Sequence, residues 1–242
     1  MASADLREAW EETAADFVTW ARTPWHDIYW HYHRDVFCEL VPPPGRRTLD
    51  LGCGEGRLSR HLKALDHEVV GVDASPTMLA AAREAARDTE THLADAAALP
   101  FADGAFDCVI AFMSLQDIDD LEGAVSEAAR VLEAGGRLCF AIVHPLNSAG
   151  SFEGELADSP FVIGGSYLDR SFYADRLSRD GLELTLTSAH RPLQAYTEAL
   201  ASAGLVIERL REPAVPEHAI ASPRTRRWQR LPLFVHGRAL KP

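Results

Sequence analysis

The chain has 242 residues, of which 47% are hydrophobic, and it carries a formal net charge of -12. This length suits one domain with a single core and is short for two full domains. The negative charge disfavours a nucleic-acid partner, because affinity for phosphates comes mainly from Lys and Arg. No apolar run reaches the ~20 residues needed to cross a bilayer, and the N-terminus has no charged-then-apolar signal pattern. We therefore expect a soluble cytoplasmic protein with neither a nucleic acid nor a membrane as partner, and the sequence leaves the oligomeric state open.

The cysteines indicate neither a metal site nor disulfide bonds. Cys38, Cys53, Cys108 and Cys139 stand singly along the chain, with no CxxC pair among them. A zinc ribbon or a disulfide framework needs paired or regularly spaced cysteines. We expect no metal.

Short apolar strands alternate with helices from Arg47 to Pro145, which is typical of a parallel sheet with helices on both faces. Ser75 followed by Pro76 marks a helix start, because the hydroxyl can cap free N–H groups and proline in the first turn loses no hydrogen bond. The expected strands cover residues 47–51, 68–73, 91–95, 105–112 and 137–145, and the expected helices cover residues 56–65, 76–86 and 121–136, the last one stopped by two glycines.

The alternation breaks after residue 145. Residues 146–191 are rich in Gly, Ser, Asp and aromatics, and only 182–187 show a clean strand pattern. A helix closed by Gly204 follows, and then two further strands at 205–210 and 231–240. We predict a single domain over residues 1–242, made of an N-terminal helical lid (1–44), a core (45–145), an insert (146–190) and a final helix with two strands (191–242).

The stretch "TLDLGCGEGRLSRHL" places three glycines, at positions 52, 54 and 56, between the first strand and the first helix of the core. Glycine lets the backbone turn sharply and approach a ligand closely, and the following helix N-terminus favours negative charge. A P-loop would require a Gly-Lys pair, which is absent. The dinucleotide fingerprint G-x-G-x-x-G requires a third glycine where Arg57 stands. The remaining G-x-G-x-G spacing is a weak signal by itself.

Two carboxylates strengthen this signal. Asp73 ends the second expected strand, where it can accept hydrogen bonds from ribose hydroxyls, and Asp95 ends the third, where it can accept from an adenine amino group. Open α/β sheets bind ligands at the carboxyl ends of their strands. The pattern therefore predicts an adenosine-containing ligand.

The segments "LDLGCGEG", "VVGVDASPTML", "LADAAALPFADGAFDCVIAFMSLQDIDD" and "RVLEAGGRLCFAIVHP" resemble, in order and spacing, the class I S-adenosylmethionine-dependent methyltransferases, and among them the small-molecule methyltransferase type 11 group. The resemblance implies a Rossmann-like, doubly wound α/β fold whose seven strands have the order 3-2-1-4-5-7-6, the last one antiparallel. It also implies S-adenosylmethionine as cofactor, S-adenosylhomocysteine as product, and transfer of a methyl group to a small-molecule acceptor. We expect O- or N-methylation in preference to C-methylation.

The same resemblance implies the residues of the cofactor site. Gly52, Cys53 and Gly54 would approach the methionine part of the cofactor, with Asp50 beneath the turn, and Asp73 would bind the ribose. Ala74 and Met78 would flank the adenine, and Asp95 with Ala96 would read its edge. The sulfonium side would be lined by Phe112, Met113 and Ser114. Gln116 and Asp117 stand where many relatives carry a pair of histidines. We expect this pair to contact the acceptor, although its role cannot be taken from the relatives.

Methyl transfer is an in-line displacement, so the enzyme mainly has to align the reacting groups in a dry pocket. An O–H or protonated N acceptor also needs a base with a pKa near the working pH, and histidine is the natural candidate. His144 ends the fifth expected strand and His190 precedes the penultimate helix, so both are candidate catalytic residues. The alternative is that either histidine is only a hydrogen-bonded part of the structure.

Aromatic side chains gather in residues 17–37, and we expect Trp25, Tyr29 and Tyr32 to contact the acceptor. This segment and the insert at 151–188 would form a lid, or the aromatics would simply pack on the sheet. His31 and His33 lie two residues apart, which makes them poor joint metal ligands on a helix. The basic cluster at 222–230 could dock an anionic acceptor or a carrier protein, or merely offset nearby acids.

Two other functions stay open from the sequence. A nicotinamide-dependent oxidoreductase can be built on a similar sheet, although Arg57 weakens that interpretation. A non-catalytic protein that binds S-adenosylmethionine would share the same motifs.

Overall fold

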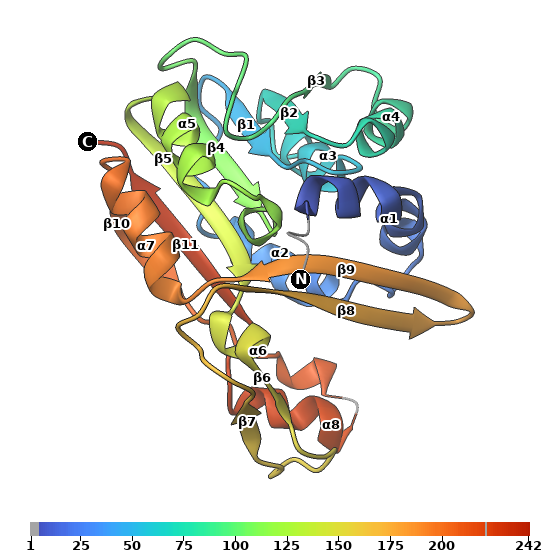
Figure 1. Ribbon diagram of the computed structural model, residues 1–242. Helices are drawn as coiled ribbons and strands as arrows, with labels where there is room; N and C mark the ends of the chain where they lie inside the picture. The colour runs from blue at the N-terminus through green and yellow to red at the C-terminus, as the bar shows by residue number, and fades with distance from the viewer. Residues whose placement is uncertain (1–4, 221) are drawn as a thin grey trace.

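The computed structural model describes residues 5–220 and 222–242. A seven-stranded sheet forms its centre, in the order β10-β11-β5-β4-β1-β2-β3 (Figure 1). Strand β11 pairs antiparallel with β5 and β10, and the other neighbours run parallel. The predicted order 3-2-1-4-5-7-6 and the doubly wound α/β fold are confirmed. The strands are β1 (Thr48–Leu51), β2 (Val69–Asp73), β3 (Glu90–Leu93), β4 (Phe106–Phe112), β5 (Leu132–Val143), β10 (Val206–Arg211) and β11 (Phe234–Leu240).

Helices flank the sheet on both faces. They are α1 (Leu6–Arg22), α2 (Ile28–Cys38), α3 (Arg57–Lys63), α4 (Pro76–Ala85), α5 (Leu121–Val131), α6 (Pro145–Ala149), α7 (Leu193–Ser202) and α8 (Pro223–Arg226), with 3-10 turns η1 (Leu115–Asp117), η2 (Glu217–Ala219) and η3 (Arg227–Gln229). Among the described residues, no helix is both long and apolar enough to cross a membrane.

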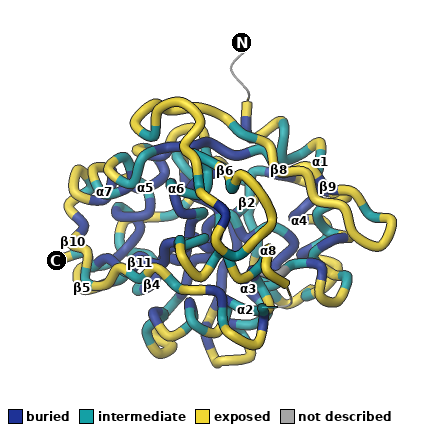
Figure 2. Tube along the Cα trace, turned by 90° about the horizontal axis from the view of Figure 1, so that it is seen from below, coloured by how far each residue is buried: buried dark blue, intermediate teal, exposed yellow. Residues whose placement is uncertain are grey.

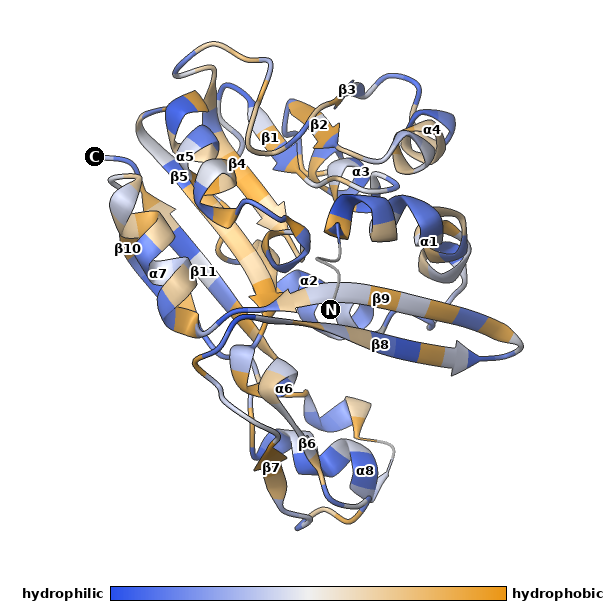
Figure 3. Ribbon diagram, in the orientation of Figure 1, coloured by the Kyte–Doolittle hydropathy of each residue, from blue (hydrophilic) through white to orange (hydrophobic). Residues whose placement is uncertain are grey.

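Two apolar clusters hold the helices to the sheet. Strand β4 feeds both, because its alternate side chains point to opposite faces. Val109 and Ala111 join the cluster that includes α5 and α7, whereas Cys108 and Ile110 join the cluster that includes α2 and α3. Burial on both faces explains why β4 after Asp107 and the second half of β5 from Leu138 are continuously apolar (Figures 2 and 3).

Most helix ends predicted from local sequence signals agree with the structure. Ser75 caps α4, since its Oγ accepts a hydrogen bond from the Met78 amide at 3.0 Å, and Gly204 adopts a φ of 75° after α7. The predicted end of α5 at Gly135 and Gly136 was wrong, because the helix stops at Val131. Leu132 already lies in extended backbone and pairs with Phe106 of β4, so sheet pairing overrides the helix propensity of the sequence.

The insert contains four strands, whereas the sequence indicated only one. Strands β6 (Gly150–Phe152) and β7 (Phe161–Ile163) form one hairpin, and β8 (Ser171–Arg179) and β9 (Leu182–His190) form another. Strand β8 was missed because most of its side chains are exposed, so no apolar alternation marks it. The β8–β9 hairpin runs beside α1 (Figure 1), and Thr13 Oγ1 donates to the Thr185 carbonyl at 3.1 Å.

One close approach fixes strand β11 against its neighbour β5. Gly237 lies opposite Phe140 in the register, and a Cβ on Gly237 would lie 2.1 Å from Phe140 Cζ.

We expect Gly237→Ala to lower the free energy of unfolding by about 1–3 kcal/mol, because the buried ring has no room to shift. Urea denaturation measures this change. The control Gly164→Ala, where an added Cβ meets nothing within 4 Å, should stay within about 0.5 kcal/mol of the parent. Equal stability of the two variants would contradict the argument.

Candidate functional site

A cavity of about 810 Å³ opens at the carboxyl ends of the central strands, between the glycine turn, helix α1 and the β8–β9 hairpin. Its size lies in the upper range of small-molecule sites. All twelve residues expected to contact the cofactor line it: Asp50, Gly52, Cys53, Gly54, Asp73, Ala74, Met78, Asp95, Ala96, Phe112, Met113 and Ser114.

The glycine turn takes its shape from left-handed backbone at Gly52 and Gly54, whose φ angles are 74° and 54°. A Cβ on Gly52 would lie 2.5 Å from Ser114 Cβ, so the turn packs directly on the segment after β4. Ser114 Oγ also donates to the Leu51 carbonyl at 2.7 Å. At Gly54, by contrast, a Cβ would meet no atom within 4 Å. The two glycines therefore serve different purposes, one for packing and one for an open approach to the cavity.

The Asp73 carboxylate connects the glycine turn to the end of β2. Its Oδ2 accepts from the Gly54 amide at 2.8 Å and its Oδ1 accepts from the Ser75 amide at 2.9 Å. Burial raises the pKa of Asp73, and the backbone amides oppose that shift. Each oxygen can accept a further hydrogen bond. Asp73 can thus hold the turn and still bind two ribose hydroxyls.

Asp50 and Cys53 lie beneath the turn. The Asp50 side chain is buried and accepts from Ser59 Oγ at 2.6 Å, and burial raises its pKa to about 7. Cys53 packs against strand β2, where a Cβ on Gly71 would lie 2.9 Å from its sulfur. Burial raises the pKa of the Cys53 thiol as well. A buried thiol of this kind is a packing group rather than a nucleophile.

The side of the cavity expected to hold adenine is lined by residues after β2 and β3. Asp95 lies beyond the end of β3 at Leu93, and its Oδ1 accepts from the Ala97 amide at 2.9 Å. Met78 is buried on the first turns of α4. The predicted strand end at Asp95 was therefore too late, although the residue still lines the cavity.

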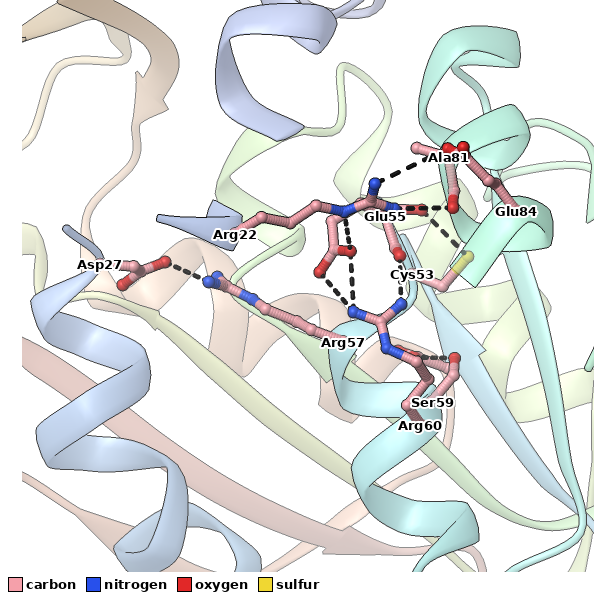
Figure 4. Close-up of polar contacts among 11 residues, drawn as sticks. Arg22, Asp27, Cys53, Glu55, Arg57, Ser59, Arg60, Ala81 and Glu84 are labelled. Atoms are coloured by element: carbon pink, nitrogen blue, oxygen red, sulfur yellow. Dashed lines mark hydrogen bonds and ion pairs between the residues drawn. The ribbon is translucent and has the colours of Figure 1, made fainter. Parts of the chain in front are cut away.

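Glu55, the residue between the last two glycines of the turn, is the centre of an ion-pair network that sequence reasoning missed (Figure 4). Its carboxylate is buried, and it accepts from Arg22 Nε at 3.3 Å and from Arg60 Nη2 at 2.8 Å. Arg22 also donates to the Ala81 carbonyl at 2.8 Å. Nothing in the sequence pairs Glu55 with Arg22, because the contact depends on how α1 folds back onto the turn.

Arg57, which excludes the dinucleotide fingerprint, connects the turn to the same N-terminal segment. It pairs with Asp27, whose side chain caps α2 (Figure 4). Its guanidinium lies 5.0 Å from the centroid of the Trp30 ring and 5.5 Å from that of Phe17. Arg57 thus has a structural partner on each N-terminal helix.

Helix α1 is also fixed to the start of α4. Glu11 Oε2 accepts from Ser75 Oγ at 2.5 Å and Glu11 Oε1 accepts from Thr77 Oγ1 at 2.5 Å. Together with Arg22, these contacts hold α1 along one wall of the cavity.

A polar cluster occupies the opposite wall. Asp117 of η1 accepts from Ser188 Oγ on β9 at 2.6 Å and from Gln116 Nε2 at 2.9 Å. Burial raises the pKa of Asp117 to about 7. Gln116 Oε1 is buried and has no hydrogen-bond partner among the described residues. Tyr173 of β8 pairs in register with Ser188 and also lines the cavity.

Of the five residues expected to contact the acceptor, the structure brings Tyr29, Gln116 and Asp117 to the cavity. Trp25 and Tyr32 do not line it. Trp25 is 59% exposed and stacks on His31, and Tyr32 packs against His218.

The two candidate catalytic histidines also lie outside the cavity lining. His144 Nδ1 accepts from the Leu146 amide at 3.0 Å, and its Nε2 lies 2.8 Å from Glu212. His190 Nδ1 lies 2.7 Å from Ser148 Oγ, and its Nε2 lies 2.9 Å from the Tyr167 carbonyl. Both imidazoles are buried with both nitrogens engaged, which fits the structural alternative for each.

The remaining polar features have structural partners. No group of three His, Cys, Asp or Glu side chains in the described part of the chain is arranged to hold a metal ion. In the basic cluster, Arg224 pairs with Glu155, Arg226 pairs with Glu217, and Arg230 donates to the Ser159 carbonyl. These contacts favour the interpretation that this cluster offsets nearby acids.

Comparison with known proteins agrees with this geometry. Residues 49–140 match the family described as methyltransferase domain. Over 118 residues the chain is 46% identical to a demethylmenaquinone methyltransferase of Thermus thermophilus, a match that covers 46% of this chain and 53% of that relative. A second relative of the same name, from Tropheryma whipplei, is 34% identical over 110 residues, with 45% and 46% covered. The chain thus spans about half the length of the curated relatives it matches.

Among solved structures, an S-adenosylmethionine dependent methyltransferase from Mesorhizobium loti superposes with a TM-score of 0.70 and 25% identity, covering 85% of this chain and 96% of that one. The family match falls on the segments that build the glycine turn and the strands around it. Sheet order, site geometry and these similarities agree: the chain has the fold of the class I S-adenosylmethionine-dependent methyltransferases, and its residues 49–140 are similar to their methyltransferase domain.

Proposed function

We propose that this protein transfers a methyl group from S-adenosylmethionine to a small-molecule acceptor, by O- or N-methylation. The main support for this proposal is a single cavity whose two walls differ in chemistry. One wall holds the glycine turn with Asp73 and Asp95, and the other holds the polar cluster around Asp117. The first wall suits an adenosine cofactor, and the second suits a polar acceptor group beside it.

The residues present fit the cofactor. Open backbone at Gly54 forms a cradle that a Cβ would partly fill, and Asp73 has free lone pairs for ribose hydroxyls. When bound there, S-adenosylmethionine supplies an electrophilic methyl group on a sulfonium, with a thioether as leaving group. Gly52, Cys53 and Gly54 would hold its methionine part, and Asp95 with Ala96 would read the adenine.

The protein's own contribution is alignment, desolvation and charge. Tyr29 and Phe112 line the cavity with ring centroids 5.0 Å apart, and aromatic faces attract a cation such as a sulfonium. Helix α1 and the β8–β9 hairpin cover the cavity and exclude water, which strengthens electrostatic interactions inside. A cavity of this size, walled by α1 and the hairpin, favours a small molecule over a polymer as acceptor.

We further propose that residues 1–44 act as a lid over the cofactor. Arg22, Glu11 and Arg57 supply its polar contacts with the turn and with α4. Opening of α1 would break these ion pairs and hydrogen bonds, while Tyr29 and Phe37 of α2 stay in the apolar cluster on the sheet.

The first prediction concerns cofactor binding. S-Adenosylhomocysteine should bind and raise the melting temperature of the protein, because it binds only the folded state. Asp73→Ala should weaken this binding by about tenfold to a hundredfold, since hydrogen bonds to a charged group in a buried site are lost. Isothermal titration calorimetry measures the affinity.

Asp88→Ala is the matched control, because Asp88 is an exposed carboxylate that pairs with Lys63 away from the cavity. It should bind S-adenosylhomocysteine like the parent. If NADH raised the melting temperature and S-adenosylhomocysteine did not, the protein would be an oxidoreductase of similar fold. Tight binding without methyl release from the labelled cofactor against a broad metabolite panel would support a non-catalytic binder.

The second prediction tests the lid. Arg22→Ala removes the contacts of α1 with Glu55 and with the Ala81 carbonyl, while Arg60 still pairs with Glu55. We expect S-adenosylhomocysteine to dissociate about tenfold faster, because mutational effects on affinity appear mainly in the dissociation rate. Stopped-flow fluorescence can follow this release through the tryptophans. Arg209→Ala on the exposed edge strand β10 serves as control, and an unchanged rate for Arg22→Ala would count against the lid.

A further inference from the structure

The acceptor wall presents hydrogen-bond acceptors and few donors. Gln116 Nε2 donates to the Met113 carbonyl at 2.6 Å and to Asp117 Oδ2 at 2.9 Å. Since both partners accept, the amide orientation is fixed and Oε1 must be the free atom. That oxygen is buried and unpartnered among the described residues, although Gln116 lines the cavity. A buried acceptor without a donor is costly, which points to a ligand group that supplies one.

Asp117 adds two further acceptor atoms. Each of its oxygens accepts one hydrogen bond, from Ser188 or from Gln116, and retains a lone pair. No Lys, Arg or His of the described chain lies within ion-pair distance of this carboxylate. Arg191 is close, but it donates to the carbonyls of the η1 segment, with the Ile118 carbonyl at 2.5 Å and the Asp119 carbonyl at 3.2 Å. Arg191 therefore positions the segment and leaves the Asp117 carboxylate facing the cavity without a direct cation.

The rest of the cavity is also predominantly negative, like the Asp117 carboxylate. Acidic side chains outnumber basic ones among its lining residues. Three of its arginines already have acidic partners, since Arg57 pairs with Asp27, Arg179 with Asp180, and Arg224 with Glu155. Of the lining arginines, only Arg7 and Arg176 have no acidic partner among the described residues, and the more numerous acidic side chains leave the cavity more attractive to a cation than to a carboxylate or phosphate.

Apolar groups line the same cavity as this polar cluster. Leu184 and Leu186 of β9 and Phe234 of β11 line the cavity with Tyr29. We propose that the acceptor is a primary amine on an apolar or aromatic body, and that Gln116 Oε1 and Asp117 bind its amino group while Asp117 takes up the proton. An ammonium group supplies three N–H donors for the acceptor atoms of Gln116 and Asp117, whereas a hydroxyl supplies one. This inference rests on the proposed function and narrows its O- or N-methylation to nitrogen.

The chemistry balances with groups already named. One ammonium proton passes to the Asp117 carboxylate, which frees the nitrogen lone pair. The nitrogen forms a bond to the methyl carbon while the carbon–sulfur bond breaks, and that electron pair stays on sulfur. The products are the N-methylated ammonium, the neutral thioether and protonated Asp117, which returns its proton to solvent. Asp117 thereby takes the place that the sequence suggested for His144 or His190.

The environment of Asp117 suits a proton acceptor at neutral pH. Burial raises its pKa to about 7, and the donors Ser188, Gln116 and the Trp10 indole N–H, together with the charge of Arg191, oppose the rise. The other ionisable groups that face it are Tyr173 of β8 and Tyr196 of α7. Both phenols have raised pKa values and stay neutral. Asp117 is therefore the group of this cluster that titrates near neutral pH.

The test uses the full chain saturated with S-adenosylhomocysteine and three probes of similar shape, namely phenethylamine, phenethyl alcohol and phenylacetate, measured by calorimetry. We expect the amine to bind about tenfold or more tightly than the alcohol and the acid, because charge-assisted hydrogen bonds are the strong ones. Asp117→Asn should weaken amine binding by about tenfold or more and change alcohol binding by less than about twofold. Glu122→Gln, an exposed acid on α5 outside the cavity, controls for the change in net charge.

The pH dependence gives a measurement that needs no variant. Phenethylamine stays protonated between pH 6 and pH 8, so only the protein changes charge. As the pH falls through about 7, Asp117 gains a proton, and amine affinity should fall by about tenfold from pH 8 to pH 6. The affinity for the alcohol should stay nearly constant.

Several outcomes would overturn the inference. These are equal binding of amine and acid, no detectable amine binding at millimolar concentration, or amine binding that responds neither to pH nor to Asp117→Asn. In each case S-adenosylhomocysteine binding by the same samples shows whether the proposed function still stands. If S-adenosylhomocysteine itself failed to bind, the proposed function would fail first.

Discussion

The site depends on one carboxylate that joins two parts of the backbone. Asp73 ends β2 and accepts from the amide of Gly54 in the neighbouring turn and from the amide of Ser75 at the start of α4. The turn itself is held from the other side by Ser114, which follows β4. Three strand ends are thereby fixed relative to each other before any ligand arrives. Pre-organisation of this kind lowers the entropic cost of ordering a site when a ligand binds.

The N-terminal segment is attached to this frame by both polar and apolar contacts. Glu55 lies inside the turn and pairs with Arg22 of α1, and Arg57 pairs with Asp27 at the start of α2. Tyr29 and Phe37 of α2 add apolar contacts with the sheet. The cavity therefore has one wall built from the sheet and a second wall held to it by ion pairs, hydrogen bonds and the apolar contacts of α2.

The sequence predicted the sheet order and the cofactor wall because both depend on local signals. Glycines after an apolar strand, Asp73 at a strand end and Ser75 before Pro76 each act within a few residues. The acceptor wall was predicted poorly, since Ser188 meets Asp117 only through the β8–β9 hairpin, and the exposed strand β8 lacks an apolar pattern. His144 and His190 have the chemistry of a base and the right chain positions, but tertiary contacts occupy both rings. Gln116 and Asp117 were identified as candidate acceptor residues from their position in the family pattern, which did not indicate their roles.

The β8–β9 hairpin supplies Tyr173, Leu184, Leu186 and Ser188 to the cavity but pairs with no strand of the central sheet. Its side chains can therefore be exchanged without disturbing the strands that carry Asp50, Asp73 and the glycine turn. Selection for a new acceptor can act on this hairpin while cofactor binding is kept. The same separation makes the hairpin the natural segment to randomise when the acceptor range of this fold is to be engineered.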